Sequence, residues 1–143
     1  MNVTVIDGQG GQLGAQLVRE IRTQLPALTL TAIGTNAAAT AAMLKAGADH
    51  AATGENPVIV ACRRADIIIG PIGIVIADAM LGEVTPQMAA AVGASNAKRI
   101  LIPMNKCDTL IAGVPEQTTA ALIDDVLRKL KKLTAETGCI SAT

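Results

Sequence analysis

The sequence predicts an α/β protein, a Rossmann-like three-layer sandwich with a mostly parallel sheet, a last antiparallel strand and a C-terminal helix. Short apolar runs alternate with stretches of helical periodicity along the chain, which is typical of strands joined by crossover helices. Glycines cluster directly after the first apolar run. Half of the 143 residues are hydrophobic, enough to bury the core of one domain. We therefore expect residues 1–143 to form a single domain.

The first half of the chain predicts three strands, each followed by a helix. Apolar runs indicate strands at residues 3–6, 28–33 and 49–52. Helical spacing indicates a helix at residues 13–25, closed by Pro26, and an Ala-rich stretch indicates another at 37–46, closed by Gly47. A short third helix is expected to start with Asn56 as its N-cap and Pro57 at its first position, and to end near Arg64.

The second half predicts three more strands. Residues 67–69 form one that breaks at Gly70-Pro71, residues 100–102 form the next, and Thr85-Pro86 starts the helix between them. A sixth strand is expected at 109–114. Only residues 104–108 separate it from the fifth strand. Because a parallel crossover needs a longer connection, the sixth strand is expected to run antiparallel. A final helix is expected at 115–134.

Composition excludes several functions. The chain has no Phe, Trp or Tyr, so no aromatic platform can bind single-stranded nucleic acid. Twelve basic and twelve acidic residues balance, so we expect no nucleic-acid partner. One histidine and three widely spaced cysteines (Cys62, Cys107 and Cys139) predict neither a metal site nor a disulfide framework. They fit a reducing cytoplasm. The start leads directly into a strand without a signal-peptide pattern, and the longest apolar stretch is too interrupted to span a membrane.

The loop after the first strand is the strongest functional signal. It contains Gly8, Gln9, Gly10, Gly11, Gln12, Leu13 and Gly14. Glycines let the backbone approach a pyrophosphate, and the following helix offers free N–H groups. The spacing predicts a site for a phosphate-bearing small molecule, with NAD or NADP as the expected cofactor. The alternative is a turn whose glycines only let the helix pack closely. Asp7, directly before it, either repels a phosphate or holds the loop through backbone bonds.

Ligands bind at the carboxyl ends of parallel strands, and further candidate residues lie there. Thr35 and Asn36 follow the second strand and are expected to contact a ribose or phosphate, although Asn36 could simply cap the next helix. Neither an acid for ribose hydroxyls nor an arginine for a 2′-phosphate is present there, which weighs against NAD specifically and leaves NADP or another phosphorylated ligand open. Other expected cofactor contacts are Gly70, Pro71, Ile72, Gly73 and Asn105, the first four alternatively forming a turn.

Three residues are candidates for catalysis. Lys106 could orient an oxyanion and lower the pKa of Cys107, unless the two belong to a tight turn. Asp78, in apolar company, is either an acid or base with a raised pKa or a capped or ion-paired residue. His50 follows Asp49, but a lone histidine is more often a surface residue.

Several segments together resemble a known family: Ile6 to Gly11, Gly34 to Asn36, Ala52 to Asn56, Gly70 to Asp78 and Ile102 to Asn105. The family is one of short bacterial proteins catalogued as a domain of unknown function. The resemblance covers nearly the whole chain and implies a Rossmann-like fold and a bacterial, cytoplasmic source. It implies no activity and no catalytic residue. The first loop alone resembles dehydrogenases, but a chain without tyrosine lacks the Tyr-x-x-x-Lys pair of short-chain dehydrogenases.

Three functions remain open from the sequence. The first is a nucleotide-binding module, such as a redox or ligand sensor. The second is a small enzyme acting on a phosphorylated or carboxylated metabolite. The third is an oligomeric scaffold with a structural glycine loop, whose apolar surfaces would lie along residues 74–81 or the last helix. A homo-oligomer, most simply a two-fold dimer, is expected in each case.

Overall fold

A computed structural model describes residues 1–104 and 108–137. Its sheet has five strands: β1 (Asn2–Asp7), β2 (Thr29–Gly34), β3 (His50–Thr53), β4 (Ile67–Pro71) and β5 (Lys98–Ile102). Their order is β3-β2-β1-β4-β5, and every neighbouring pair is parallel. The protein therefore has an α/β fold, as predicted, and β1 is the central strand.

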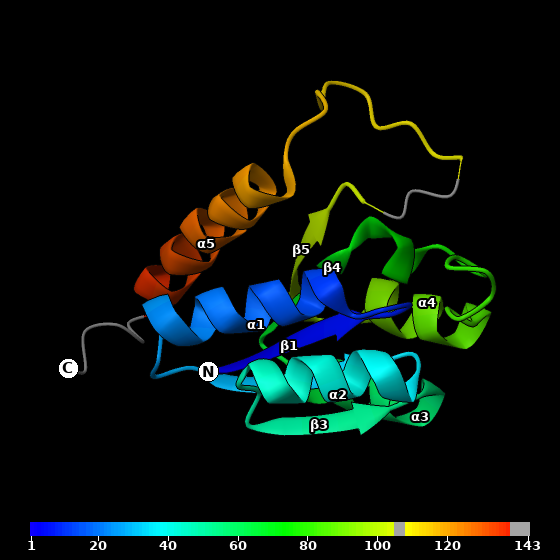
Figure 1. The fold of residues 1–143 in the computed structure, drawn as a ribbon, viewed down its shortest axis with the longest axis horizontal. Helices are drawn as coiled ribbons and strands as arrows, with labels where there is room; N and C mark the ends of the chain where they lie inside the picture. The colour runs from blue at the N-terminus through cyan, green and yellow to red at the C-terminus, as the bar shows by residue number, and fades with distance from the viewer. Residues whose placement is uncertain (105–107, 138–143) are drawn as a thin grey trace.

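Helices cover both faces of this sheet (Figure 1). They are α1 (Gln12–Gln24), α2 (Ala37–Ala46), α3 (Glu55–Arg64), α4 (Pro86–Ala94) and α5 (Thr119–Glu136), with a short 3₁₀ helix, η1 (Ile72–Val75), after β4. Three helices start with a side-chain cap, from Asn36, Thr85 or Thr118. Such caps satisfy N–H groups that the first helical turn leaves unpaired.

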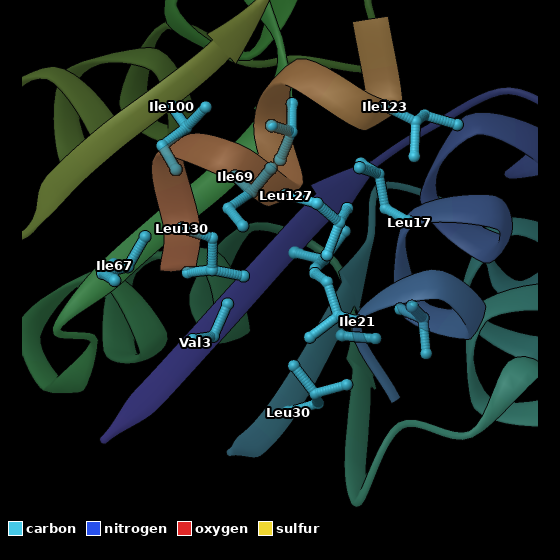
Figure 2. Close-up of a cluster of buried hydrophobic side chains, with 14 of the residues drawn as sticks. Val3, Leu17, Ile21, Leu30, Ile67, Ile69, Ile100, Ile123, Leu127 and Leu130 are labelled. Atoms are coloured by element: carbon cyan, nitrogen blue, oxygen red, sulfur yellow. The ribbon is translucent and has the colours of Figure 1, made fainter. Parts of the chain in front are cut away.

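Two aliphatic cores lie on opposite faces of the sheet. The first joins the sheet to α1 and α5, with the labelled residues of Figure 2 in contact: Val3, Leu17, Ile21, Leu30, Ile67, Ile69, Ile100, Ile123, Leu127 and Leu130. The second lies under α3 and α4 and includes Ile6, Ile68 and Val92. Because side chains alternate along a strand, Val3 and Val5 of β1 face the first core, and Ile6 faces the second.

The expected antiparallel strand at 109–114 is wrong. The structure has no strand there, and all five strands are parallel. The hydrophobic residues that suggested it do not pair with β5: Leu110 is 93% exposed. In Figure 1 the chain from residue 108 onward extends as a long arm that leads to α5. An apolar alternation cannot form a strand without a neighbouring ladder to bond, which the sequence alone does not reveal.

Some element boundaries also differ from those expected. Gly70 and Pro71 do not break β4 but continue it, in register with Leu101 and Ile102 of β5. A Cβ on Gly70 would lie 2.4 Å from the Ile6 carbonyl oxygen, so this glycine permits close approach to β1. The third helix begins at Glu55 with Gly54 as N-cap. Pro57 is tolerated inside its first turn because N–H groups there need no helical acceptor.

Candidate functional site

The glycine loop lies at the reversal point of the sheet. From β1 the chain continues outward to β2 and β3, then crosses back to β4 on the other side of β1. The carboxyl end of β1 is thus flanked by two connections that leave in opposite directions, which opens a crevice in sheets of this kind. Residues 8–11 fill the short interval between β1 and α1.

Asp7 holds this loop from within. Its carboxylate accepts one hydrogen bond from the Gly8 N–H at 2.8 Å and a second from the Gly14 N–H, in α1, at 2.7 Å. Burial raises the pKa of the Asp7 carboxyl, the two N–H groups lower it, and the nearby charge of Glu83 raises it again; the net direction is upward. Of the two roles left open for Asp7, the structure supports the bracing one.

Three of the four glycines have packing reasons to be glycine. A Cβ on Gly8 would lie 2.4 Å from Thr35 Oγ1, one on Gly11 would lie 2.6 Å from the Ala39 backbone, and one on Gly14 would lie 2.8 Å from Asp7 Cβ. Gly11 also has a φ of 72°, a conformation that favours glycine. The fourth, Gly10, is different. A Cβ there would meet only Gln12 Cγ, at 4.0 Å, so the open side of the loop is at Gly10.

The same open side presents unused donors. The N–H groups of Gly10, Gln12 and Leu13 have no acceptor among residues 1–104 and 108–137. Gln12 and Leu13 are the first two residues of α1, where the helix carries a partial positive charge. This combination of free N–H groups and positive helix end suits an anion.

Glu83 brings a carboxylate to the loop from the segment between η1 and α4. Its Oε1 accepts hydrogen bonds from the Gln9 N–H at 2.9 Å, the Thr35 hydroxyl at 2.7 Å and the Asn36 side-chain amide at 2.6 Å. Partial burial alone would raise the pKa of Glu83, but these three donors together hold it below its usual value. Its Oε2 forms no bond with any residue the structure describes.

The segment that carries Glu83 is unusually strained. Asp78, Met80 and Leu81 all have φ between 57° and 65°, and Gly82 has 90°. Left-handed conformations are costly for side chains such as Leu and Met, and surrounding contacts must hold them. Here the Asp78 N–H donates to the Val84 carbonyl at 2.7 Å and Met80 is buried, whereas the Leu81 side chain is 99% exposed.

The structure brings together Thr35, Asn36 and the glycine loop, as predicted from the strand ends. Asn36 does cap α2, since its Oδ1 accepts from the Ala39 N–H at 2.8 Å. Its amide also donates to the Gln9 carbonyl at 2.9 Å, so capping and loop contact occur together. Pro71 follows Gly70 at the end of β4, and Ile72 and Gly73 lie in η1.

The candidate catalytic residues gain less support. Asp78 lies in the turn after η1 with its side chain exposed, and that side chain has no hydrogen-bond or ion-pair partner among residues 1–104 and 108–137. It is therefore not enclosed by its apolar sequence neighbours, and its role in catalysis stays a prediction. Asn105, Lys106 and Cys107 lie outside the described residues. Asp49 pairs with Arg22 at 2.7 Å rather than polarising His50.

The sequence alone did not indicate Glu83. An acid that binds a ribose usually stands at the end of the second strand, where this chain has Thr35 and Asn36. The Glu83 carboxylate lies at that strand end, although residue 83 is 48 positions from Thr35. No spacing rule connects the two, because only the path of the turn after η1 determines where Glu83 lies.

Within the described part of the chain, no helix is both long and apolar enough to cross a bilayer. No curated protein and no solved structure is significantly similar to the chain. The model of one family, described as a domain of unknown function (DUF3842), matches residues 2–135. With the glycine loop, its Asp7 brace and nearly all of the described helices and strands inside that match, the chain belongs to the DUF3842 family.

Proposed function

We propose that this protein binds a nicotinamide dinucleotide, with its pyrophosphate on the glycine loop. The observation that carries the proposal is the set of free N–H groups at Gly10, Gln12 and Leu13, at the carboxyl end of the central strand. The strand order equals that of the first five strands of the Rossmann sheet, where dinucleotides bind at this position. The alternative of a purely structural loop accounts for Gly8, Gly11 and Gly14, but not for Gly10.

Glu83 supports an adenosine ribose as the neighbouring group. In dinucleotide folds an acid at the end of the second strand accepts hydrogen bonds from the ribose hydroxyls. Glu83 is bonded to Thr35 and Asn36 at that strand end through Oε1, while Oε2 remains available. A carboxylate there would attract the two hydroxyls of NAD and repel the 2′-phosphate of NADP. We therefore propose that NAD is preferred over NADP.

Thermal melting against NAD, NADH, NADP, NADPH, FAD, FMN, ATP and GTP tests the proposal. At a ligand concentration one hundred times the dissociation constant, binding stabilises the folded state by about 2.7 kcal/mol. We expect a rise in melting temperature with the nicotinamide dinucleotides, larger for NAD than for NADP. If no nucleotide raises it, the glycine loop is structural and the proposal fails.

Gly10→Ala separates the binding role from the structural one. Its new Cβ has open space in the unliganded protein, so the melting temperature without ligand should stay nearly unchanged. With NAD present, the methyl group would occupy the space through which the pyrophosphate approaches, and the ligand-induced rise should be lost. Gly93→Ala, which also meets nothing within 4 Å, is the matched control and should keep the rise. A normal rise in Gly10→Ala would place the ligand elsewhere.

Glu83→Gln tests the ribose contact. The amide can still accept a hydrogen bond but has no charge, and charge-assisted bonds are roughly twice as strong as neutral ones. We expect affinity for NAD to fall about tenfold, which is about 1.4 kcal/mol, and affinity for NADP to fall less or to rise. Glu20→Gln, on the outer part of α1, is the control. An unchanged NAD-to-NADP ratio in Glu83→Gln would exclude Glu83 from the ribose site.

A further inference from the structure

A cavity lies on the face of the sheet that α3 covers, over strands β1, β2 and β3. Its volume is about 580 Å³, within the range of pockets that hold small molecules. Strands β1, β2 and β3 form its floor, and one face of α3, at residues 57, 60, 61 and 64, forms its wall. That spacing is one stripe of a helix. The cavity shares no residue with the glycine loop, so it is a separate place in the fold.

The floor of this cavity is polar where a buried parallel sheet is usually aliphatic. Thr4, Thr31 and His50 are register partners on three adjacent strands, so their side chains lie in one row on one face. Thr29 and Asn2, also partners, continue the polar surface toward the strand starts. Parallel strands that are covered on both faces consist mostly of Val, Ile and Leu. On the opposite face, β1 follows that rule with Val3 and Val5.

Thr4 is the clearest sign that the polar row serves a ligand. It is one of the few buried polar residues in the described ranges, at 2% exposure, and its side chain forms no hydrogen bond with a described residue. Among the described residues, every fully enclosed side-chain oxygen or nitrogen has a partner. The Thr4 hydroxyl must therefore reach open space, and the space that Thr4 lines is this cavity. Buried polar groups normally form hydrogen bonds, so we expect an occupant of the cavity to form one with the Thr4 hydroxyl.

The cavity has a basic end and an apolar end. Because α3 runs back from the ends of the strands to their starts, Arg64 lies toward Asn2 and Thr29, and Pro57 lies toward Ile33 and Ala52. Arg64 has no ion-pair or hydrogen-bond partner in the described ranges, and none of the described residues that line the cavity is acidic. A guanidinium with hydroxyl neighbours suits one carboxylate, which it can bind with two parallel hydrogen bonds.

We infer that this cavity is a binding site for a small aliphatic carboxylate. The carboxylate head lies at Arg64 among the threonine hydroxyls, and the hydrocarbon tail lies against Ile33, Ala52 and Val60. The chemistry at each end follows from the lining residues: one cation with several hydroxyls at one end, and at the other mostly aliphatic side chains, with Asn56 beside Pro57. This site does not depend on the glycine loop, and it stands or falls apart from nucleotide binding.

The single histidine of the chain makes the test direct. His50 lines the cavity, so its imidazole resonances in an NMR spectrum report on the site without assignment ambiguity. Three probes are compared: hexanoate, hexan-1-ol and inorganic phosphate. We expect hexanoate to shift the His50 signals with a dissociation constant of about 1 mM or lower. The alcohol lacks the charge and phosphate lacks the tail, so both should bind at least about tenfold more weakly.

Arg64→Gln and Arg63→Gln form a matched pair. Both residues are exposed at the end of α3, but Arg63 lines a different hollow, with Cys62 and Ser95. Arg64→Gln should weaken hexanoate binding about tenfold or more, and Arg63→Gln should leave it unchanged. Thr31→Val, which removes one hydroxyl at nearly constant volume, should also weaken it. Melting-temperature shifts with NAD should be the same in all three variants.

Four results would overturn the inference. His50 signals that stay fixed with hexanoate up to about 10 mM would exclude a useful affinity. If hexan-1-ol bound as tightly as hexanoate, the carboxylate would not contribute to binding. If phosphate bound as tightly, the hydrocarbon tail would not contribute. Signals that move with protein concentration alone would show that a second copy of the chain covers this face.

Discussion

Asp7 is the side chain on which the shape of the glycine loop depends. It is 2% exposed and accepts the N–H groups of Gly8 and Gly14. Asp7→Ala leaves both donors without a partner in a buried place, and we expect a loss of about 1–3 kcal/mol in the free energy of unfolding. Urea unfolding measures it. Asp66→Ala, which removes an exposed bond to the Asn2 N–H, should change stability by about 0.5 kcal/mol or less. Equal effects would contradict the bracing role.

Cys62 is expected to be chemically inert in the folded protein. It is buried, and burial raises the pKa of its thiol to about 11, against a small lowering by Arg99. Because the thiolate is the reactive form, iodoacetamide at neutral pH should leave Cys62 unmodified in the native state and modify it in urea. Peptide mass spectrometry distinguishes it from Cys107 and Cys139. Rapid native modification of Cys62 would mean that α3 opens far more often than its packing suggests.

At the residue scale, prediction from sequence succeeded for two helix caps and failed for a third. Asn36 and Thr85 are N-caps, as local rules predict, whereas Asn56, also expected as an N-cap, lies inside α3, whose N-cap is Gly54. Glu83 was not predicted, because its position depends on a turn in which four of the five residues 78–82 have positive φ. Two of the four are Met80 and Leu81, residue types for which no local preference indicates a left-handed conformation.

The contact of α1 with β1 and α2 at Gly14 is a place where the packing of whole elements can be tested. Gly14, inside α1, faces the Cβ of Asp7 in β1 and the sulfur of Met43 in α2. In Gly14→Ala the gain in helix propensity, about 1 kcal/mol, is outweighed by forced movement of the three elements, so we expect a net loss of about 1–2 kcal/mol. Gly93→Ala, in open space on α4, should instead stabilise the protein by about 0.5–1 kcal/mol. Chemical denaturation of both variants measures the change in the free energy of unfolding. An increase in Gly14→Ala would contradict the close packing at Gly14.

Asp49, directly before β3, forms hydrogen bonds with β2 and α1 and makes the stability of the fold depend on pH. Its carboxylate accepts from the Leu30 N–H of β2 and from Arg22 of α1, and these two bonds lower the pKa of Asp49. A lowered pKa in the folded state adds stability above the ordinary value of 3.8, and this stability is lost as the pH falls through the folded value. Asp49→Asn should therefore be less stable than wild type at neutral pH.

The pH range of that effect follows from its sign. The difference between wild type and Asp49→Asn should shrink as the pH falls from about 5 to about 2, because the wild-type carboxyl is then protonated in both states. Unfolding free energies measured at several pH values across this range give the curve. A difference that stays constant with pH would show that Asp49 acts through its shape alone.

At the element scale, the sequence predicted the helices and strands best where apolar residues recur with a clear period. Residues 13–25, with apolar side chains at helical spacing, were predicted as a helix, and α1 spans Gln12–Gln24. The segment 109–114 consists mostly of apolar residues, as many strands do, yet the segment is a loop and mostly exposed. The difference is the presence of a partner: β5 pairs with β4 on one side, and the segment does not turn back to pair on the other.

The assembly of whole molecules remains a prediction, and sedimentation velocity at micromolar concentration tests it. We expect a dimer, the commonest closed assembly. The last helix is a poor surface for it, since its apolar face packs in the first core. Leu81 and Leu110, 99% and 93% exposed, are better candidates. Leu81→Asp or Leu110→Asp should therefore yield a monomer, and a wild-type monomer would contradict the expectation.

The sequence by itself determined the α/β class, the glycine loop at the end of the first strand and most of the helices. These follow from periodicity and from the backbone preferences of glycine and capping residues, which act over a few positions. Tertiary structure decided the rest: the order of the strands, the carboxylate of Glu83 at the end of β2 and the row of Thr4, Thr31 and His50 under α3. Each of these brings together residues from distant parts of the chain, and the physical reason is the same. Their proximity is fixed by how strands pair and where a strained turn points, and local sequence preferences do not encode either.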